Sequence, residues 1–521
     1  MSIPINSNLK EADHPPSPKV TLLERLELNQ GLMNLDTQSK LVVVIVGLPA
    51  RGKSYIVKKL KRYLSWLGLN VKVFNVGDRR RRLSVDFVGA TNDSTTIEEK
   101  LSNQELEMYN HNRHSSSFFD PNNAEAFKKR EEIAMQALDE VIAWVREKGL
   151  VAIHDATNST IRRRQNIIDR LEKEKDVKLL FIESICNDDK ILDANIKMKT
   201  LSPDYVGIDP AVAEADFRKR LKNYELSYET IDGYEEKRQV QYCKIIDVGS
   251  KIITYNINGF LEGQCVFYLM NMNLQPRVIY ITRHGESNDN IVGKIGGDAS
   301  LSPQGIKYGK DLTKFIQEHH SNFQKNIDSN GLNTNIFPEG TMNGNQSYKP
   351  KETQKNLEIW TSMLKRTLQT VQFFDHSKVK LKKFNALNEL YSGLCEGMTY
   401  SEIPKQYPRE FSDRSSDKLF TRYPGIHGES YVDVIHRLQH IIVELERMHN
   451  SVLIVTHRAV TRTLISYFMD ISIEEMPFLN IPIGHVYACE LKPHGNELSV
   501  YKWNEDDGTF SKTNNDTLYK N

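Results

Sequence analysis

Short apolar runs alternate with helical patterns in the first part of the chain. The runs are LVVVIV at 41–46, VKVFNV at 71–76, LVAIH at 150–154 and KLLFIES at 178–184. Between the first two runs, apolar residues recur at helical spacing and fall on one face: Ile56, Val57, Leu60, Tyr63, Leu64 and Leu67. Strands that alternate with helices are typical of a parallel sheet covered by helices. We therefore predict an α/β domain with a mainly parallel sheet.

A second series of the same kind follows. It begins with RVIYIT at 277–282, continues with EIWTS at 358–362 and closes with SVLIVT at 451–456, and helical stretches such as 430–448 separate the runs. A chain of 521 residues is also too long for one ordinary core. The predicted fold class is therefore α/β with two α/β domains, joined near NMNLQP at 271–276.

Several polar segments interrupt this pattern. We expect residues 1–36 to form a mobile arm and the insertions at about 83–117 and 319–356 to be loose surface loops. We expect the first domain to span residues 37–276 and the second to span residues 277–492, each including its insertion. A polar C-terminal tail is expected at 493–521.

Charge and cysteine content narrow the classes of function. The net charge of +1 gives no chain-wide basic field, which counts against a dedicated nucleic-acid binder. The five cysteines are scattered without metal-ligand spacing, so we expect reduced thiols. No stretch reaches the roughly 18 apolar residues of a membrane span, and the first residues contain no apolar signal core. These features predict a cytoplasmic protein without a membrane partner.

The segment GLPARGKS at 47–54 follows the first apolar run and precedes the first helical pattern. In such a loop, Gly47 and Gly52 let the backbone wrap around an anion, and the amides at the start of the helix point at the phosphates. Lys53 can then reach the outer phosphate oxygens, and the hydroxyl of Ser54 can hold Mg²⁺. The pattern predicts a site for a nucleoside triphosphate.

Acceptor groups are expected near the same sheet edge. Asp155 ends the run at 150–154, where open parallel sheets bind ligands, and it can orient Mg²⁺ or accept a proton from a hydroxyl. An N-cap aspartate is the competing interpretation. Cationic residues gather at 79–82, at 162–164 and at 219–220. They favour a phosphorylated acceptor over a neutral one, although charge runs are usually solvated faces.

The segment RHGES at 283–287 indicates a second, different chemistry. The imidazole of His284 can attack phosphorus and form a phosphohistidine, which divides one difficult displacement into two easier steps. Such an attack needs cations on the phosphoryl oxygens and an acid for the leaving alkoxide. Arg283, Arg366 and His457 are the candidates for the first role, and Glu389 is the candidate for the second. One chain thus carries residues for adding a phosphate and for removing one.

At this point the sequence resembles the 6-phosphofructo-2-kinase/fructose-2,6-bisphosphatase family between about residues 38 and 492. The motifs that carry the resemblance occur in this order: GLPARGKS, VFNVG, DATN, FIESICND, SPDY, RHGES, IGGD, WTS, KRT, MTY, RYP and GESY. The resemblance implies a kinase that moves the ATP γ-phosphate to the 2-hydroxyl of fructose 6-phosphate. It also implies a histidine phosphatase, similar to phosphoglycerate mutases, that hydrolyses the 2-phosphate of fructose 2,6-bisphosphate.

The resemblance also implies roles for individual residues. ATP would lie on the loop, formed by Gly47, Leu48, Pro49, Ala50, Arg51, Gly52, Lys53, Ser54 and Tyr55. Ser54 and Asp155 would hold Mg²⁺, with Asp155 also the catalytic carboxylate. The sugar phosphate would meet Arg80, Thr157, Arg163, Lys199, Arg220 and Tyr224. In the phosphatase, His284 would be the nucleophile, Glu389 the acid, and Arg283, Arg366 and His457 the clamp. The surrounding substrate contacts would be Asn290, Gly296, Tyr400, Arg414, Lys418, Tyr431 and Arg462.

Three positions depart from the family pattern. Asp120 stands where animal members have an arginine, and a carboxylate facing a sugar phosphate would repel it. Either that loop is arranged differently, for example with Arg113, or fructose 6-phosphate binds weakly. Arg458 replaces a glutamine and adds a cation near the 6-phosphate. The segment NELYSG at 388–393 lacks the aspartate common two residues after the catalytic glutamate.

Several alternatives remain open at this stage. One activity can dominate in the same architecture, and the kinase is the weaker candidate because of Asp120. A nucleic-acid end-processing kinase-phosphatase would need a long basic groove, and a non-catalytic scaffold would have lost its active-site residues. Ser84 in RRRRLS is a candidate for a basophilic kinase, with an unmodified loop serine as the alternative. A homodimer is also open.

Overall fold

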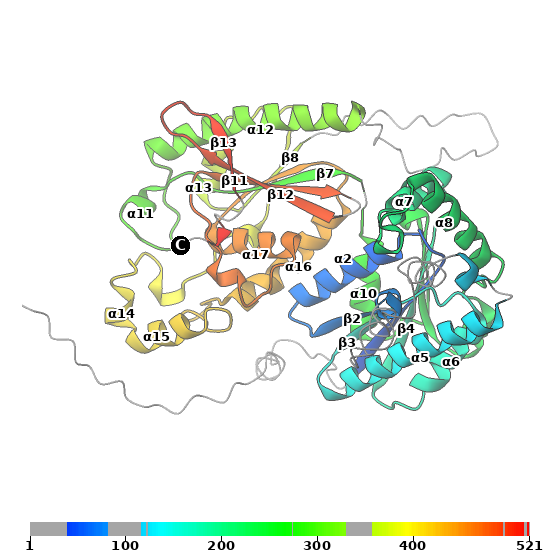
Figure 1. The fold of residues 1–521 in the computed structure, drawn as a ribbon. Coiled ribbons are helices and arrows are strands. Elements are labelled where there is room, and N and C mark those ends of the chain that lie inside the picture. Colours follow the sequence, from blue (N-terminus) through cyan, green and yellow to red (C-terminus); the bar gives the residue numbers. More distant parts are fainter. Residues whose placement is uncertain are drawn as a thin grey trace, which may run out of the picture.

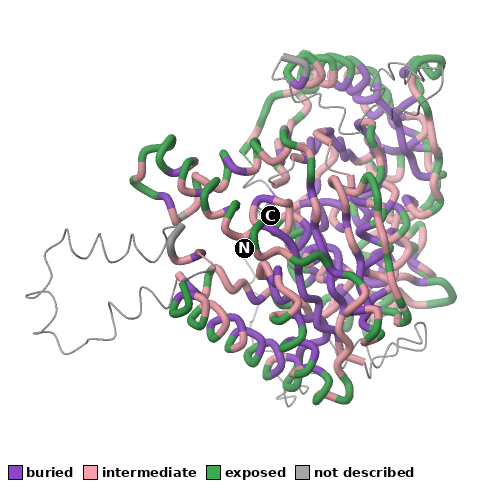
Figure 2. Tube along the Cα trace, turned by 90° about the vertical axis from the view of Figure 1, so that its right-hand side faces the viewer, coloured by how far each residue is buried: buried purple, intermediate pink, exposed green. Residues whose placement is uncertain are grey.

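The computed structural model describes residues 39–81, 116–120, 123–273, 275–329, 357–492, 495–514 and 518–519 (Figure 1). These residues form two sheets. The first has the strand order β2-β3-β1-β4-β5-β6 and the second has the order β13-β12-β11-β7-β10-β8-β9. Helices cover both sheets, and Figure 2 shows that the buried positions concentrate in the interior of the molecule. The predicted fold class, two α/β domains, is confirmed.

The first sheet is mainly parallel, as predicted. Its strands are β1 (Lys40–Val46), β2 (Val71–Asn75), β3 (Val151–Asp155), β4 (Val177–Ile185), β5 (Gln241–Ile246) and β6 (Lys251–Tyr255). Only β6 is antiparallel, against β5. The four predicted strands are confirmed, whereas β5 and β6 were missed. The helices are α2 (Lys53–Trp66), α5 (Ala124–Glu147), α6 (Ile161–Leu171), α7 (Asp189–Lys199), α8 (Pro210–Glu225), α9 (Gly233–Lys237) and α10 (Phe260–Met270), with short 3-10 turns at η2 (Ser116–Phe119), η3 (Pro203–Tyr205) and η4 (Asp247–Gly249).

The central strand β1 is apolar on both faces, which explains its continuous hydrophobic run. Leu41, Val43 and Ile45 pack in one apolar cluster with residues of α2 and α10. Val42 and Val44 pack on the opposite face with residues of α5 and α6. The strand is therefore sandwiched between two helical layers, and its carboxyl end opens into the loop at 47–52.

The second sheet combines a parallel part with an antiparallel edge. Its strands are β7 (Arg277–Arg283), β8 (Glu358–Thr361), β9 (Lys380–Lys383), β10 (Val452–Thr456), β11 (His485–Lys492), β12 (Gly495–Trp503) and β13 (Phe510–Thr513). Strands β7 to β10 pair in parallel, and β11, β12 and β13 are antiparallel. The helices and turns are α11 (Asn288–Ile291), α12 (Pro303–Ser329), α13 (Lys365–Thr370), η5 (Asn385–Leu387), η6 (Gly393–Cys395), α14 (Ile403–Gln406), α15 (Pro408–Ser416), α16 (Tyr431–Arg447), α17 (Arg458–Met469) and η7 (Met476–Phe478).

Two of the expectations about polar segments were wrong. The predicted tail at 493–521 contains β12 and β13, which complete the second sheet. Its polar composition hid the alternation in β12, where Leu498 and Val500 are buried between polar neighbours. The predicted loop at 319–356 begins as helix, because α12 continues to Ser329 and buries Ile327. The expected arm at 1–36, Arg113, Ser84 and most of the 83–117 insertion lie outside the described residues.

Other expectations concern the cysteines and the membrane. All five cysteines are free and buried, so the expectation that they are not disulfide-bonded is confirmed. None of the helices in the described part of the chain combines the length and the hydropathy needed to cross a bilayer.

Helix α2 connects the two sheets through a buried ionic cluster. The carboxylate of Glu446 on α16 accepts hydrogen bonds from Lys59 at 2.8 Å, Arg62 at 2.7 Å and the Tyr467 hydroxyl at 2.6 Å. Arg277 lies 3.8 Å from the same carboxylate. Burial alone would raise the pKa of Glu446, but Lys59, Arg62 and Arg277 outweigh it and lower the pKa to about 2. Glu446 is therefore the shared anion that neutralises this interface.

Replacing Glu446 by glutamine should lower the free energy of unfolding by about 3–5 kcal/mol, because three buried cations lose their only shared anion. The measurement is urea unfolding followed by circular dichroism. Glu444→Gln is the matched control on the same helix, since it removes only an accessible pair with Arg447, which is worth at most about 1 kcal/mol. Equal destabilisation by the two substitutions would show that the cluster does not stabilise the fold.

Candidate active sites

The loop between β1 and α2 has a backbone that requires glycine at two positions. Gly47 has a φ of 133°, and a Cβ added there would lie 2.5 Å from the Ser184 carbonyl oxygen. Gly52 has a φ of 86° and directly precedes α2. Side chains are strained in both conformations. The chain can therefore turn tightly and aim the first amides of α2 into the space beyond the strand ends.

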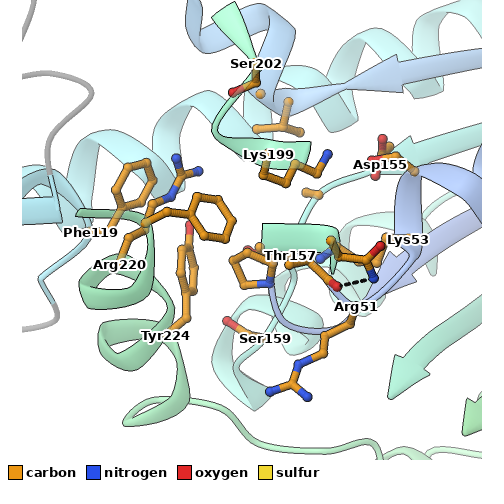
Figure 3. A pocket seen from close by; sticks show the side chains of 18 of the residues that line it. Arg51, Lys53, Phe119, Asp155, Thr157, Ser159, Lys199, Ser202, Arg220 and Tyr224 are labelled. Atoms are coloured by element: carbon orange, nitrogen blue, oxygen red, sulfur yellow. Dashed lines mark hydrogen bonds between the residues drawn. The ribbon is translucent and has the colours of Figure 1, made fainter. Parts of the chain in front are cut away.

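A cavity of about 850 Å³ opens at this edge of the sheet (Figure 3). The cavity is lined by two residues of the loop and by all the residues outside the loop that were predicted to act in the kinase reaction. These residues are Lys53, Ser54, Arg80, Asp155, Thr157, Arg163, Lys199, Arg220 and Tyr224. Residues Pro49 to Gly52 and Tyr55 line it as well, whereas Gly47 and Leu48 support the loop from behind. The fold thus gathers residues as far apart in the sequence as Pro49 and Tyr224 around one space.

Lys53 and Asp155 meet in the buried part of this cavity. The Lys53 ammonium donates to the carbonyl oxygen of Leu48 at 2.5 Å, and Asp155 accepts from the Asn75 side chain at 2.7 Å. Burial lowers the pKa of Lys53 to about 7, with Asp155 opposing the shift. Burial also raises the pKa of Asp155, against the attraction of Lys53 and Lys199. The N-cap interpretation of Asp155 is wrong, because Thr160 caps α6.

Two carboxylates hold four of the arginines that line the cavity. Asp204 accepts from Arg80 at 2.7 Å, Arg81 at 3.2 Å and Arg220 at 3.3 Å. Arg163 donates to both oxygens of Glu131 at 2.7 Å. The interpretation of these cations as a solvated face is therefore wrong for the residues that line the cavity. They face a confined space as a preformed group of positive charges.

Not every member of the three charge runs belongs to the site. Arg164 is fully buried and pairs with Glu235 at 2.5 Å, so it stabilises the fold. Arg79, Arg162 and Lys219 do not line the cavity. Asp120 does not line it either, although its neighbours Phe118 and Phe119 do. Sequence reasoning missed Arg81 as a lining residue, and it missed Arg130, whose single position in the helical pattern at 124–147 gave no signal.

The residues predicted to remove a phosphate surround the end of β7. His284 is 3% exposed, and its Nδ1 lies 2.6 Å from the Gly285 carbonyl oxygen. Since a carbonyl oxygen only accepts, Nδ1 carries the proton and the lone pair of the neutral ring lies on Nε2. The ring centroid of His457 is 5.2 Å away. The two imidazoles that the sequence singled out are thus neighbours.

Cations also surround the imidazole of His457, the ring next to His284. Arg366 donates from Nε to Nδ1 of His457 at 3.3 Å, and His457 Nε2 lies 2.8 Å from the Ser362 hydroxyl. Arg366 also donates to the Gly297 carbonyl at 2.7 Å, and Arg283 donates to the Ile481 carbonyl at 2.9 Å. These backbone contacts fix both guanidinium groups. The two arginines and the histidine of the predicted clamp therefore lie together in the fold.

The side chain of Glu389 lies against the N-terminal end of α17. Its carboxylate accepts from the backbone amides of Arg458 at 3.0 Å and Ala459 at 3.2 Å. The positive end of a helix attracts a carboxylate in this position. Arg283 and Arg366 are both attracted electrostatically to Glu389. The carboxylate consequently faces the same space as the two imidazoles and the two arginines.

Further cations flank this space. Burial lowers the pKa of Lys418, and Arg462, Arg414 and Arg458 lower it further, which places these four cations together. Arg462 donates to the Tyr431 hydroxyl at 2.8 Å. Of the other predicted contacts, Asn290 completes the capping box of α11, whose N-cap is Ser287, Gly296 has a φ of 72°, and Tyr400 is 58% exposed.

The imidazole of His284 should still be neutral at about pH 6.5, where an ordinary histidine is half protonated. Protonation would add charge to a buried site, and burial, Arg366 and Arg283 all lower the pKa of His284. Nitrogen NMR of labelled histidine measures this directly, with His284→Gln assigning the signal. Arg366→Gln should raise the pKa of His284. Titration of the parent signal near pH 6.5 would contradict the geometry.

Comparison with known proteins gives a consistent result along both halves of the chain. Residues 29–276 match the family described as 6-phosphofructo-2-kinase, and residues 343–506 match the histidine phosphatase superfamily, branch 1. The chain is 42% identical over 501 residues to a probable 6-phosphofructo-2-kinase of Schizosaccharomyces pombe, covering 91% of this chain and 71% of that one.

Two other relatives carry different names. Identity is 39% over 465 residues with 6-phosphofructo-2-kinase/fructose-2,6-bisphosphatase 3 of Rattus norvegicus, covering 88% of this chain and 72% of the relative. It is 38% over 471 residues with a fructose-2,6-bisphosphatase of Saccharomyces cerevisiae, covering 90% of each. With both matches in the same order along one chain, the protein belongs to the 6-phosphofructo-2-kinase/fructose-2,6-bisphosphatase family.

Proposed function

We propose that this chain catalyses two opposing reactions on one metabolite. The first cavity makes fructose 2,6-bisphosphate from fructose 6-phosphate and ATP, and the second site hydrolyses it to fructose 6-phosphate and phosphate. The observation that carries the proposal is the completeness of both residue sets in one chain. Lys53, Ser54 and Asp155 share one cavity, and at the end of the second sheet His457 lies beside His284 and accepts a hydrogen bond from Arg366.

In the kinase reaction, the amides of the loop and the start of α2 bind the ATP phosphates. Lys53 moves from the Leu48 carbonyl to the outer phosphate oxygens. Asp155 accepts the proton of the attacking 2-hydroxyl, a role favoured by the raised pKa of this carboxyl. Arg80, Lys199 and Arg220 bind the phosphate of the sugar, which competes with Asp204 for the arginines.

The residues fit Mg²⁺ as the metal of this reaction. Ser54 and Asp155 both line the cavity and offer oxygen ligands, and Mg²⁺ usually takes one or two protein ligands beside phosphate and water. When bound, Mg²⁺ supplies positive charge to the transferred phosphoryl group. Ser54 and Asp155 would hold it at the boundary between nucleotide and acceptor.

In the phosphatase reaction, Nε2 of His284 attacks the phosphorus of the 2-phosphate. A nitrogen–phosphorus bond forms while the bond to the sugar oxygen breaks, and Glu389 donates a proton to that oxygen. Arg283, Arg366 and His457 stabilise the charge on the phosphoryl oxygens. Glu389 then accepts a proton from water, which attacks the phosphohistidine and releases phosphate. The cations Arg414, Lys418, Arg458 and Arg462 bind the 6-phosphate of the same substrate.

The proposal extends to location and regulation. Five buried free thiols fit a reducing compartment, which supports a cytoplasmic protein. Phosphorylation of Ser84 by a basophilic kinase would place a dianion in the chain segment that follows Arg80 and Arg81.

The direct test incubates the purified protein with fructose 6-phosphate and Mg·ATP, and separately with fructose 2,6-bisphosphate, and follows both products. Formation of fructose 2,6-bisphosphate in the first reaction and of fructose 6-phosphate in the second supports two activities. Absence of one product restricts the chain to the other reaction.

A further inference from the structure

Arg130 lies on α5 and lines the acceptor part of the first cavity. Its guanidinium faces three aromatic rings. The distance from Cζ of Arg130 to the ring centroid is 5.7 Å for Phe118, 5.9 Å for Phe119 and 5.8 Å for Phe127. It also donates from one terminal nitrogen to the carbonyl oxygen of Phe118. The side chain is thus held in place by an aromatic platform and one backbone contact.

Arg130 lies next to other arginines that line the cavity. The ring of Phe119 also has Arg220 at 3.7 Å and Arg80 at 5.2 Å, and it packs on the ring of Tyr224 at 5.6 Å. Figure 3 shows Phe119, Arg220 and Tyr224 grouped at the cavity. Three guanidinium groups therefore converge on one phenyl ring beside a tyrosine that lines the same space.

Arg130 differs from the other arginines of this cluster in its partners. Arg80 and Arg220 pair with Asp204, and Arg163 pairs with Glu131. Within the part of the chain that the structure describes, no carboxylate forms an ion pair with Arg130, which contacts aromatic rings and one carbonyl oxygen. Removing a guanidinium from water without an anion is costly. An anion that enters the cavity would remove that cost.

We propose that Arg130 binds the phosphate of the acceptor and determines its specificity for a phosphorylated sugar. One terminal nitrogen stays on the Phe118 carbonyl, and the remaining N–H groups of the fork are available to phosphoryl oxygens. Arg163 and Arg220 contribute neighbouring positive charge. The inference rests on the proposed kinase function and deepens it. It also gives the cavity a cation near the turn where Asp120 stands, since Phe118 and Phe119 belong to that turn.

The test replaces Arg130 by methionine, which keeps an apolar stem on the phenylalanine platform and removes the charge. Lys129→Met on the same helix is the matched control, because Lys129 is exposed and does not line the cavity. We expect the KM for fructose 6-phosphate to rise about 10- to 100-fold in Arg130→Met, as for a lost charged hydrogen bond. The KM for ATP should change less than about twofold in both variants.

The decisive readout is the ratio of kcat/KM for fructose 6-phosphate to kcat/KM for fructose. Arg130→Met should reduce this ratio by about the same factor as the KM change, because only the phosphorylated acceptor uses the charge. A purely structural Arg130 would reduce both values together. An unchanged ratio, or equal effects of Lys129→Met, would overturn the proposal.

Equilibrium dialysis of fructose 6-phosphate against the full chain, with a non-hydrolysable ATP analogue, separates this inference from the proposed function. If the parent protein binds the sugar phosphate in this experiment but transfers no phosphate to it in the separate incubation with Mg·ATP, the kinase assignment fails. The inference about Arg130 still stands if Arg130→Met weakens that binding about tenfold or more. It falls if binding is unchanged, or if the parent does not bind the sugar phosphate.

Discussion

Replacing His284 by alanine should abolish the hydrolysis of fructose 2,6-bisphosphate and leave the kinase reaction intact. The loss should be on the order of 10³- to 10⁶-fold in kcat, as when other enzymes lose their nucleophile. The neighbouring cations cannot replace the imidazole, because Arg283 and Arg366 carry no lone pair for attack. Phosphate release from labelled substrate measures the loss, and acid-labile label on the protein measures the phosphohistidine.

His376→Ala is the matched control for this experiment. His376 is exposed on the second domain, so its loss should change neither reaction. Kinase activity within about twofold of the parent in His284→Ala would show that the first domain remains folded. The phosphatase assignment is wrong if His284→Ala still hydrolyses the substrate at a rate close to that of the parent.

Asp155→Asn should reduce the kinase rate by about 10²- to 10⁴-fold, the usual contribution of a general base. Asparagine keeps the shape of the side chain and an oxygen that can accept from Asn75, but it cannot take the proton of the 2-hydroxyl. Asp155 ends a strand of the first sheet, whereas the phosphatase residues lie on the second. The phosphatase rate should therefore stay within about twofold of the parent.

Asp139→Asn provides the comparison, because Asp139 is an exposed residue of α5 that pairs with Arg170. Coupled assay of ADP release under saturating fructose 6-phosphate gives the kinase rate for each variant. A kinase rate in Asp155→Asn equal to that of Asp139→Asn would exclude Asp155 as the proton acceptor.

The residues of both sites that could be predicted from the sequence share one property. Each lies in or beside a short continuous stretch of sequence that indicates its position. Gly47, Gly52 and Lys53 lie within seven positions of one another after a buried strand. His284 and His457 each follow an apolar run, and the carboxyl ends of parallel strands meet at one edge of a sheet. A strand end therefore predicts a position in space as well as in sequence.

The parts that sequence missed depend on contacts between distant segments. Lys59 and Glu446 are separated by 387 positions, and their places in two predicted helices did not indicate that they pair. Arg130 is one cation in a long helix, and only its packing on the turn at Phe118 and Phe119 brings it into the cavity. The strands β12 and β13 were missed because half of their residues are polar and face solvent, so composition indicated a tail.

Helix α2 gives the architecture its most direct connection between the two sites. It begins at Lys53, beside the first cavity, and its later residues Arg62 and Trp66 contact α17, which follows His457. The side chain of Trp66 donates to the Thr463 carbonyl at 3.1 Å. One predicted residue of each site, Lys53 in the first and His457 in the second, thus lies at the start of one of two helices that pack together.

The central claim is that two separate sites act in opposite directions on one metabolite. Its most direct test follows radiolabelled γ-phosphate of ATP in one preparation supplied with fructose 6-phosphate. The account predicts label first on the 2-position of the sugar, then in acid-labile form on the protein, and finally as inorganic phosphate, with His284→Ala stopping it on the sugar and Asp155→Asn keeping it in ATP. Release of labelled phosphate that never passes through the sugar, or failure of label to reach the sugar at all, would contradict it.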